Sequence, residues 1–156
     1  MKKDVYVYRY KDAAYVNLTN RCTNDCVFCL RRNRSGVGEY NLWLEREPEA
    51  KDVIAALKEQ EEYRELVFCG FGEPTIRLDV LLKVAEYAKR MGKKVRVDTN
   101  GHASAFHHRD AAAEMKGRVD AVSVSLNAVT PKMYQKRCRS RYGEQAFFYM
   151  LEFAGA

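Results

Sequence analysis

The sequence predicts an α/β protein, a partial (βα) barrel that has an N-terminal β-hairpin and is truncated after about four βα units. Two observations predict this class. Short apolar runs, over residues 65–69, 94–98 and 119–126, alternate with longer segments in which apolar residues recur at helical spacing. Polar and glycine-containing motifs stand where these runs end, and in parallel βαβ units functional groups collect beyond the carboxyl ends of the strands. We therefore expect one domain over residues 1–156, incomplete at its C-terminus.

The N-terminal part of the chain predicts the hairpin and the first helix. Residues 5–10 and 14–18 alternate tyrosine and valine around Lys11-Asp12, which is typical of two strands joined by a tight turn. The second of these strands leads into a cysteine-rich loop. A basic, flexible loop with two glycines is expected over residues 31–38. Pro48 then opens a helical pattern that ends before the next apolar run.

The central part of the chain continues the alternation of strand and helix. After the strand over residues 65–69, residues 78–91 predict a helix closed by Gly92. A third apolar run predicts a strand over residues 94–98, and an alanine-rich helix is expected over residues 105–115.

The last segment predicts a fourth strand and two further helical stretches. The strand covers residues 119–126, Thr130-Pro131 starts a helical region, and the helix is interrupted near Gly143 and resumes over residues 144–153. No fifth strand follows that helix. We therefore expect a fragment with an open sheet edge, which cannot by itself sustain turnover because water would reach a site that later strands should enclose.

The composition is that of an ordinary soluble protein, with 47% hydrophobic and 31% charged residues. No signal peptide and no apolar stretch of about 18 residues is present, so we expect a cytoplasmic protein that does not enter the membrane. Five cysteines, an odd number with three clustered, indicate a reducing compartment rather than a disulfide framework. The net charge of +6 is concentrated at the two ends of the chain, but charge alone does not support nucleic-acid binding.

Three cysteines, Cys22, Cys26 and Cys29, stand at a C-x3-C-x2-C spacing that lets one short loop direct three sulfurs at one point. Three thiolates without a nearby fourth ligand fit a cubane iron–sulfur cluster with one open iron, whereas structural zinc usually takes four protein ligands. Two alternatives remain at this point: a zinc site completed by a distant His or Cys, or unligated thiols in a reducing cytosol.

Further polar motifs follow three of the predicted strands. The sequence Gly70-Phe-Gly-Glu-Pro74 reads either as a plain turn or as a loop where glycine lets a ligand approach the backbone. After the next strand, Asp98 and Thr99 are candidates for substrate or cofactor contact, whereas Asn100-Gly101 reads as an ordinary turn. Alternating polar residues share one face of the last strand and its extension: Ser123, Ser125 and Asn127.

The remaining cysteines and the histidines favour simpler interpretations. Cys69 lies in an apolar strand and is expected to pack in the core. Cys138 is flanked by cations that would lower its pKa, so a role as an auxiliary ligand stays open. No histidine stands at a metal-binding helical spacing with a carboxylate, and we expect turn or surface positions for His102, His107 and His108.

The cysteine spacing, with Phe28 just before the last cysteine, resembles the signature of the radical S-adenosylmethionine (SAM) superfamily. The turn over residues 70–74 resembles that family's Gly-Gly-Glu-Pro turn, with one inserted aromatic as a departure. Within the superfamily, the chain is similar to the TatD-associated radical SAM proteins over nearly its whole length, but only over the first four of six βα units. That similarity rests on Asn17-Leu-Thr-Asn-Arg-Cys22, the turn over residues 70–74, Val97-Asp-Thr-Asn-Gly101, Leu126-Asn-Ala128 and Tyr134…Cys138…Tyr142-Gly.

The resemblance implies a partial barrel of the radical SAM type, in which Cys22, Cys26 and Cys29 hold a [4Fe–4S] cluster whose fourth iron chelates SAM. It further implies an electron donor such as flavodoxin or ferredoxin, and reductive cleavage of SAM to a 5′-deoxyadenosyl radical that abstracts hydrogen from an unidentified substrate. The residues it implies for SAM contact are Phe28, Gly70, Gly72, Glu73, Asp98, Ser125 and Asn127.

Two other functions remain open from the sequence. Residues 97–101 are faintly similar to those of activases that install a glycyl radical on a partner protein. A non-catalytic metal-binding module with nucleic-acid affinity is the alternative from a different class.

Overall fold

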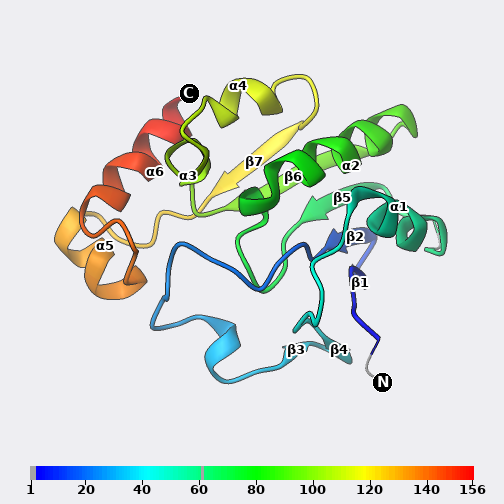
Figure 1. The fold of residues 1–156 in the computed structure, drawn as a ribbon, viewed down its shortest axis with the longest axis horizontal. Coiled ribbons are helices and arrows are strands. Elements are labelled where there is room, and N and C mark those ends of the chain that lie inside the picture. The colour runs from blue at the N-terminus through cyan, green and yellow to red at the C-terminus, as the bar shows by residue number, and fades with distance from the viewer. Residues whose placement is uncertain (1–2, 61) are drawn as a thin grey trace.

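A five-stranded sheet with strand order β1-β2-β5-β6-β7 forms the centre of the computed structural model, which describes residues 3–60 and 62–156 (Figure 1). The first two strands form an antiparallel hairpin, and the other three add to it in parallel. The strands are β1 Val7–Tyr10, β2 Ala13–Val16, β5 Glu65–Phe68, β6 Lys94–Thr99 and β7 Ala121–Val124. The predicted α/β class and N-terminal hairpin are confirmed, and the parallel strands with their helices form a partial (βα) barrel.

Helices follow the parallel strands, and side chains cap the starts of α1, α4 and α5. Glu49 and Asp52 form a reciprocal capping box at the start of α1, and the Thr130 hydroxyl accepts the Met133 N–H at the start of α5, 3.2 Å away. The helices are α1 Ala50–Lys58, α2 Leu78–Arg90, α3 Ala103–His107, α4 Ala111–Met115, α5 Pro131–Cys138 and α6 Gln145–Gly155, with 3₁₀ turns η1 Leu30–Arg32 and η2 Pro74–Arg77. No described helix has both the length and the apolar character needed to cross a membrane.

The two faces of the sheet differ because side chains alternate along each strand. One face carries residues in register, Val16, Phe68 and Val97, which are fully buried in the main core together with the apolar sides of α1 and α2. On the other face, Arg96 and Ser123 carry polar side chains and stay partly or fully exposed. The polar face is therefore the one left open toward a site.

A second, smaller core joins α5 and α6. It contains Ala128, Tyr134, Cys138, Ala146, Phe147 and Met150, and the side chain of Cys26 packs against it. This small core is important because it connects the two C-terminal helices to the cysteine loop.

Two predicted elements differ in the structure. The helix expected over residues 105–115 is two helices, α3 and α4, because His108 adopts a left-handed conformation (φ 53°) and the Asp110 side chain caps α4 by accepting the Ala113 N–H at 2.9 Å. The loop expected over residues 31–38 contains η1 and the strand β3 Gly36–Val37, which pairs with β4 Tyr40–Asn41. A side chain at Gly36 could not fit, since its Cβ would lie 1.6 Å from the Tyr40 carbonyl oxygen.

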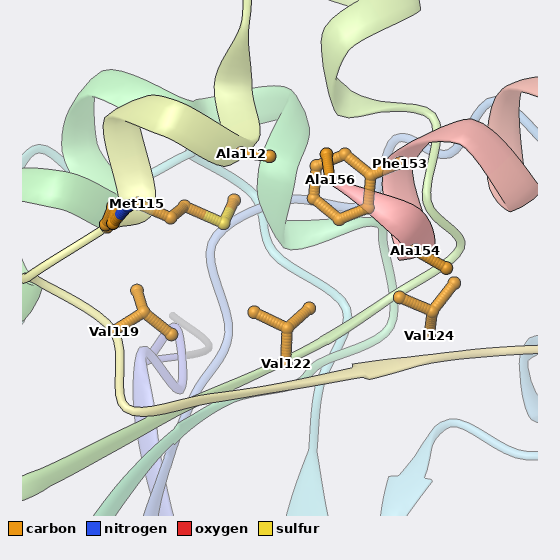
Figure 2. A pocket seen from close by; sticks show the side chains of 9 residues that line it. Ala112, Met115, Val119, Val122, Val124, Phe153, Ala154 and Ala156 are labelled. Carbon is orange, nitrogen blue, oxygen red and sulfur yellow. The ribbon is translucent and has the colours of Figure 1, made fainter.

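The free edge of the sheet borders an apolar hollow of about 220 Å³ between β7, α4 and the end of α6. Figure 2 shows Val119, Val122 and Val124 pointing toward Met115 and Phe153 across this hollow. Val122 remains 41% exposed. The helix-covered face of the sheet is thus less completely covered at β7 than at β5 and β6.

Candidate functional site

The carboxyl ends of the parallel strands open onto one cavity of about 240 Å³. Its wall combines the cysteine loop with the segments that follow β5, β6 and β7. Every residue predicted for the cluster or for SAM contributes to that wall: Cys22, Cys26, Phe28, Cys29, Gly70, Gly72, Glu73, Asp98, Ser125 and Asn127. The structure therefore brings these residues together, and their roles toward a cluster or SAM remain predictions.

Backbone hydrogen bonds hold the cysteine loop on two sides. On one side the Glu73 N–H donates to the Arg21 carbonyl oxygen at 2.8 Å. On the other side the N–H groups of Asp25 and Val27 donate to the carbonyl oxygens of Cys138 and Arg137, both at 2.9 Å. The loop is thus held between the turn after β5 and the C-terminal end of α5.

Two of the cysteine sulfurs accept N–H hydrogen bonds. Cys22 Sγ accepts from the Asn24 backbone N–H at 3.4 Å and from Asn100 Nδ2 at 3.7 Å, and Cys29 Sγ accepts from Arg31 Nε at 3.3 Å. Such donors stabilise thiolates and tune the metal that the thiolates bind. They suit sulfurs that carry negative charge.

Burial opposes ionisation of the free thiols. It raises the pKa of Cys22, and burial, followed by the neighbouring Cys138, raises the pKa of Cys26 to about 12. A bound metal reverses this rise in the thiol pKa, because a coordinated thiol is deprotonated.

The spacing of the three thiols bears on the choice between zinc and a cluster. In the described part of the chain, no group of three or more His, Cys, Asp or Glu side chains is close enough to hold a single metal ion. A structural zinc ion needs four ligands around one centre, whereas in an iron–sulfur cube each thiolate binds a different iron. The binding of a cluster rather than zinc by these three thiols therefore remains a prediction.

A buried amide in the same wall also points to a bound group. Asn24 is only 5% exposed, and its Oδ1 has no hydrogen-bond partner among the described residues, although its Nδ2 donates to the Tyr134 hydroxyl at 3.2 Å. An unpaired buried polar atom is costly, so a ligand in the cavity is a natural partner for it.

The turn after β5 is fixed by the side chain of Glu73, which is 5% exposed. Glu73 Oε1 accepts the Thr75 N–H at 3.1 Å, the Thr75 hydroxyl at 2.6 Å and the Thr99 hydroxyl at 2.7 Å. Its Oε2 accepts the Asn100 N–H at 2.8 Å. Burial raises the pKa of Glu73, and these donors oppose that shift by stabilising the carboxylate. This carboxylate therefore joins the ends of β5 and β6.

The glycines of the turn are required by close packing against the start of the cysteine loop. A Cβ on Gly70 would lie 2.2 Å from Asn17 Oδ1, and a Cβ on Gly72 would lie 2.3 Å from the Thr19 carbonyl oxygen. The sequence suggested close approach of a ligand as the reason for glycine. The structure adds a different reason, which is that the cysteine loop packs directly on the turn.

Asn100 lies in the expected turn, where its Oδ1 accepts the His102 N–H at 3.0 Å, but the surface position expected for His102 is wrong. Asn100 is 8% exposed, lines the cavity, and donates from Nδ2 to Thr23 Oγ1 at 2.9 Å. His102 is 1% exposed; its Nε2 lies 3.1 Å from the Ala146 carbonyl oxygen, and its Nδ1 lies 2.9 Å from Thr23 Oγ1. Because a carbonyl can only accept, Nε2 carries the proton, and the Thr23 hydroxyl donates to Nδ1.

Burial lowers the pKa of His102 to about 4, so its ring is neutral at pH 7. The neutral ring also contacts the Tyr134 hydroxyl at 3.2 Å. A buried polar network therefore runs from Asn100 through Thr23 and His102 to Tyr134. Asn100 could have been suspected from its place at a strand end, and Tyr134 belongs to one of the motifs that carry the family resemblance, whereas nothing in the sequence pattern marks His102.

Cys69 was expected in the core, and it lies instead on the cavity wall at the end of β5. Burial, followed by the nearby carboxylate of Asp98, raises its pKa to about 12. Asp98 itself forms an ion pair with Arg96, with 2.6 Å between Oδ1 and Nη1. His107 and His108 are partly and fully exposed, in keeping with the expected surface positions.

The residues after β7 complete the wall. The Ser125 N–H donates to the Thr99 carbonyl oxygen at 3.0 Å, and Asn127 Nδ2 donates to Cys138 Sγ at 3.6 Å. Ser123, on the same face of the strand, is exposed and lies outside the cavity wall. Phe28 lines the cavity and is 55% exposed.

Comparison with known proteins gives three matches. The family model of the radical SAM superfamily matches residues 16–154. A probable GTP 3′,8-cyclase from Methanopyrus kandleri is 33% identical over 128 residues, which are 81% of this chain and 38% of that protein. The solved structure of TYW1 with a lysine–pyruvate adduct bound superposes with a TM-score of 0.60 at 15% identity, covering 91% of this chain and 50% of that one.

The chain therefore spans half or less of the length of these relatives. The likeness to TYW1 shows the fold, and the narrower similarity to TatD-associated proteins remains a prediction. Because the family model covers the cysteine loop, the turn after β5 and the strands that carry the cavity wall, the chain belongs to the radical SAM superfamily.

Proposed function

We propose that this chain is the cluster- and SAM-binding part of a radical SAM enzyme. The observation that carries the proposal is that Cys22, Cys26 and Cys29 share one cavity with all the residues predicted to contact SAM. Membership in the superfamily and the cyclase relative support an enzyme over a non-catalytic metal-binding module. When bound, the [4Fe–4S] cluster supplies the electron for reductive cleavage of SAM to a 5′-deoxyadenosyl radical.

In this proposal the turn after β5 receives the amino group of SAM. Glu73 Oε1 already accepts three hydrogen bonds, but among the described residues Oε2 accepts only the Asn100 N–H. Oε2 is therefore the less occupied of the two oxygens, and we assign it the contact with an ammonium donor. Gly70 and Gly72 expose their backbone to the same cavity.

The polar face of the sheet would hold the substrate beside SAM. Asp98 and Cys69 lie where this face meets the cavity, and the Arg96–Asp98 ion pair fixes the carboxylate there. These groups position a substrate and help to exclude water, which would otherwise quench a radical. An electron donor such as flavodoxin or ferredoxin would approach from the side of Cys29, where Phe28 and Leu30 are 55% and 54% exposed.

Anaerobic reconstitution with iron and sulfide tests the proposal. The wild-type chain should show the absorbance and the reduced-state electron paramagnetic resonance of one [4Fe–4S] cluster, and single changes of Cys22, Cys26 or Cys29 to Ala should abolish both signals. Cys69→Ala is the matched control, because it removes a thiol from the same wall without removing a predicted ligand. Tight stoichiometric binding of zinc with no iron uptake would refute the cluster.

The SAM site is tested with Glu73→Gln, which keeps the side-chain volume and one acceptor oxygen. Losing a charge-assisted hydrogen bond should weaken SAM binding about 10- to 100-fold while the iron content stays unchanged. Equilibrium dialysis of labelled SAM against the reconstituted variant measures this. Wild-type affinity in the variant would remove Glu73 from the SAM site.

A further inference from the structure

Cys138 has no part in the proposed function, yet it lies directly behind the cysteine loop. It is the last residue of α5 and is fully buried, whereas Cys22, Cys26 and Cys29 are partly exposed. It packs in the small core between α5 and α6. Its thiol accepts a hydrogen bond from Asn127, a residue of the cavity wall.

Cys26 is the cluster cysteine that Cys138 touches. The backbone bonds from Asp25 N–H to the Cys138 carbonyl oxygen and from Val27 N–H to the Arg137 carbonyl oxygen, each 2.9 Å, flank Cys26 on both sides and hold it against the end of α5. The Cys26 side chain packs against the core that contains Cys138.

We propose that Cys26 and Cys138 form a reversible disulfide when the loop carries no cluster, and that this bond prevents the loop from binding one. The backbone hydrogen bonds hold the segment around Cys26 against the end of α5, and this brings the Cys26 side chain to the core in which Cys138 is buried. The disulfide removes one of three thiolates. Its effect on cluster loading rests on the proposed function, whereas the disulfide itself does not.

The chemistry balances with a peroxide as oxidant. The partly exposed Cys26 thiol reacts with hydrogen peroxide to give a sulfenic acid and one water. The buried Cys138 thiol then attacks that sulfur, forming the S–S bond and releasing a second water. A reducing thiol reverses the reaction by exchange.

Peptide mapping of the cluster-free full chain tests the pairing. Cleavage before Asp25 and after Phe28 isolates Cys26 from Cys22 and Cys29, and cleavage after Tyr134 and Tyr142 isolates Cys138. After peroxide treatment and alkylation of free thiols, we expect a disulfide-linked pair of residues 25–28 and 135–142, with Cys22 and Cys29 alkylated. Cys69→Ser serves as the matched control and should give the same linked pair. A bond from Cys26 to Cys22 or Cys29, or an unlinked Cys26, overturns the proposal.

Iron uptake by the same oxidised chain tests the consequence. Without reductant the oxidised chain should fail to take up a cluster, and dithiothreitol should restore uptake to the level of the untreated chain. Full uptake by the linked chain would overturn the regulatory role and would also remove Cys26 from the ligand set, while leaving the disulfide established. Failure of the untreated chain to bind iron would instead refute the proposed function alone.

Discussion

Cys22 and Cys29 stand at the two ends of one loop, but their surroundings differ. On the side of Cys22, the donor Asn100 and the adjoining Thr23 are buried, and both connect to the network of Glu73 and His102. On the side of Cys29, the donor is Arg31, which also bonds the Asn20 carbonyl oxygen, and the neighbouring apolar residues are exposed.

This difference in burial suggests that the two ends of the loop have different roles, one in fixing its position and the other in admitting a partner. Buried and fully bonded groups fix geometry, since each lost partner leaves another group unsatisfied. An exposed flank leaves room for a partner to approach. We infer that the Cys22 end determines where the loop sits, and that the Cys29 end is adjustable without loss of the fold.

The largest expected effect on the free energy of unfolding comes from removing the Glu73 side chain, which lies at the buried, Cys22 end of the cysteine loop. Glu73→Ala removes the acceptor of four hydrogen bonds, from two backbone amides and two hydroxyls, so the free energy of unfolding should fall by about 3–5 kcal/mol. Urea denaturation of the cluster-free chain measures this. Glu152→Ala, at an exposed position of α6, is the matched control and should change little. Equal stability of both variants would show that the buried end does not hold the turn.

A smaller effect is expected from protonation of His102. The pKa of this ring is lowered to about 4 in the folded state, from an ordinary value of about 6.5, so the neutral ring stabilises the folded state above pH 6.5. That contribution, about 3 kcal/mol, should be lost as the pH falls from 6.5 to 4. We expect His102→Gln to lack this part of the pH dependence in urea midpoints.

The control for this prediction is His108→Gln, since His108 is exposed. Its pH dependence should follow that of the wild type. If His102→Gln lost stability toward acid as steeply as the wild type, then the buried network would not depend on a neutral His102.

The smallest effect on stability is expected at the exposed end. Arg31→Gln removes the N–H bond to Cys29 Sγ and should lower the free energy of unfolding by only about 1 kcal/mol. The same change should shift the midpoint potential of a reconstituted cluster to a more negative value, because fewer hydrogen bonds reach the sulfurs. Redox titration measures the shift, with Arg34→Gln as control. A potential unchanged by Arg31→Gln would mean that this donor does not tune the site.

Much of this arrangement was predictable because it depends on local pattern. The apolar runs and the turn residues predicted the hairpin and the parallel strands, and strand ends predicted which polar residues would meet. The break between α3 and α4 was not predictable from helical spacing, since it depends on the left-handed His108 and the cap at Asp110.

Local sequence was enough to predict the fold class, the spacing of Cys22, Cys26 and Cys29, and the motifs after β5, β6 and β7. These follow from periodicity and from spacing within a few residues. The contact of Asn24 with Tyr134, 110 residues further along the chain, and the packing of Cys26 on the core that contains Cys138 are visible only in the folded chain. Such contacts depend on how the helices after β7 fold back over the cysteine loop, and no local pattern encodes that packing.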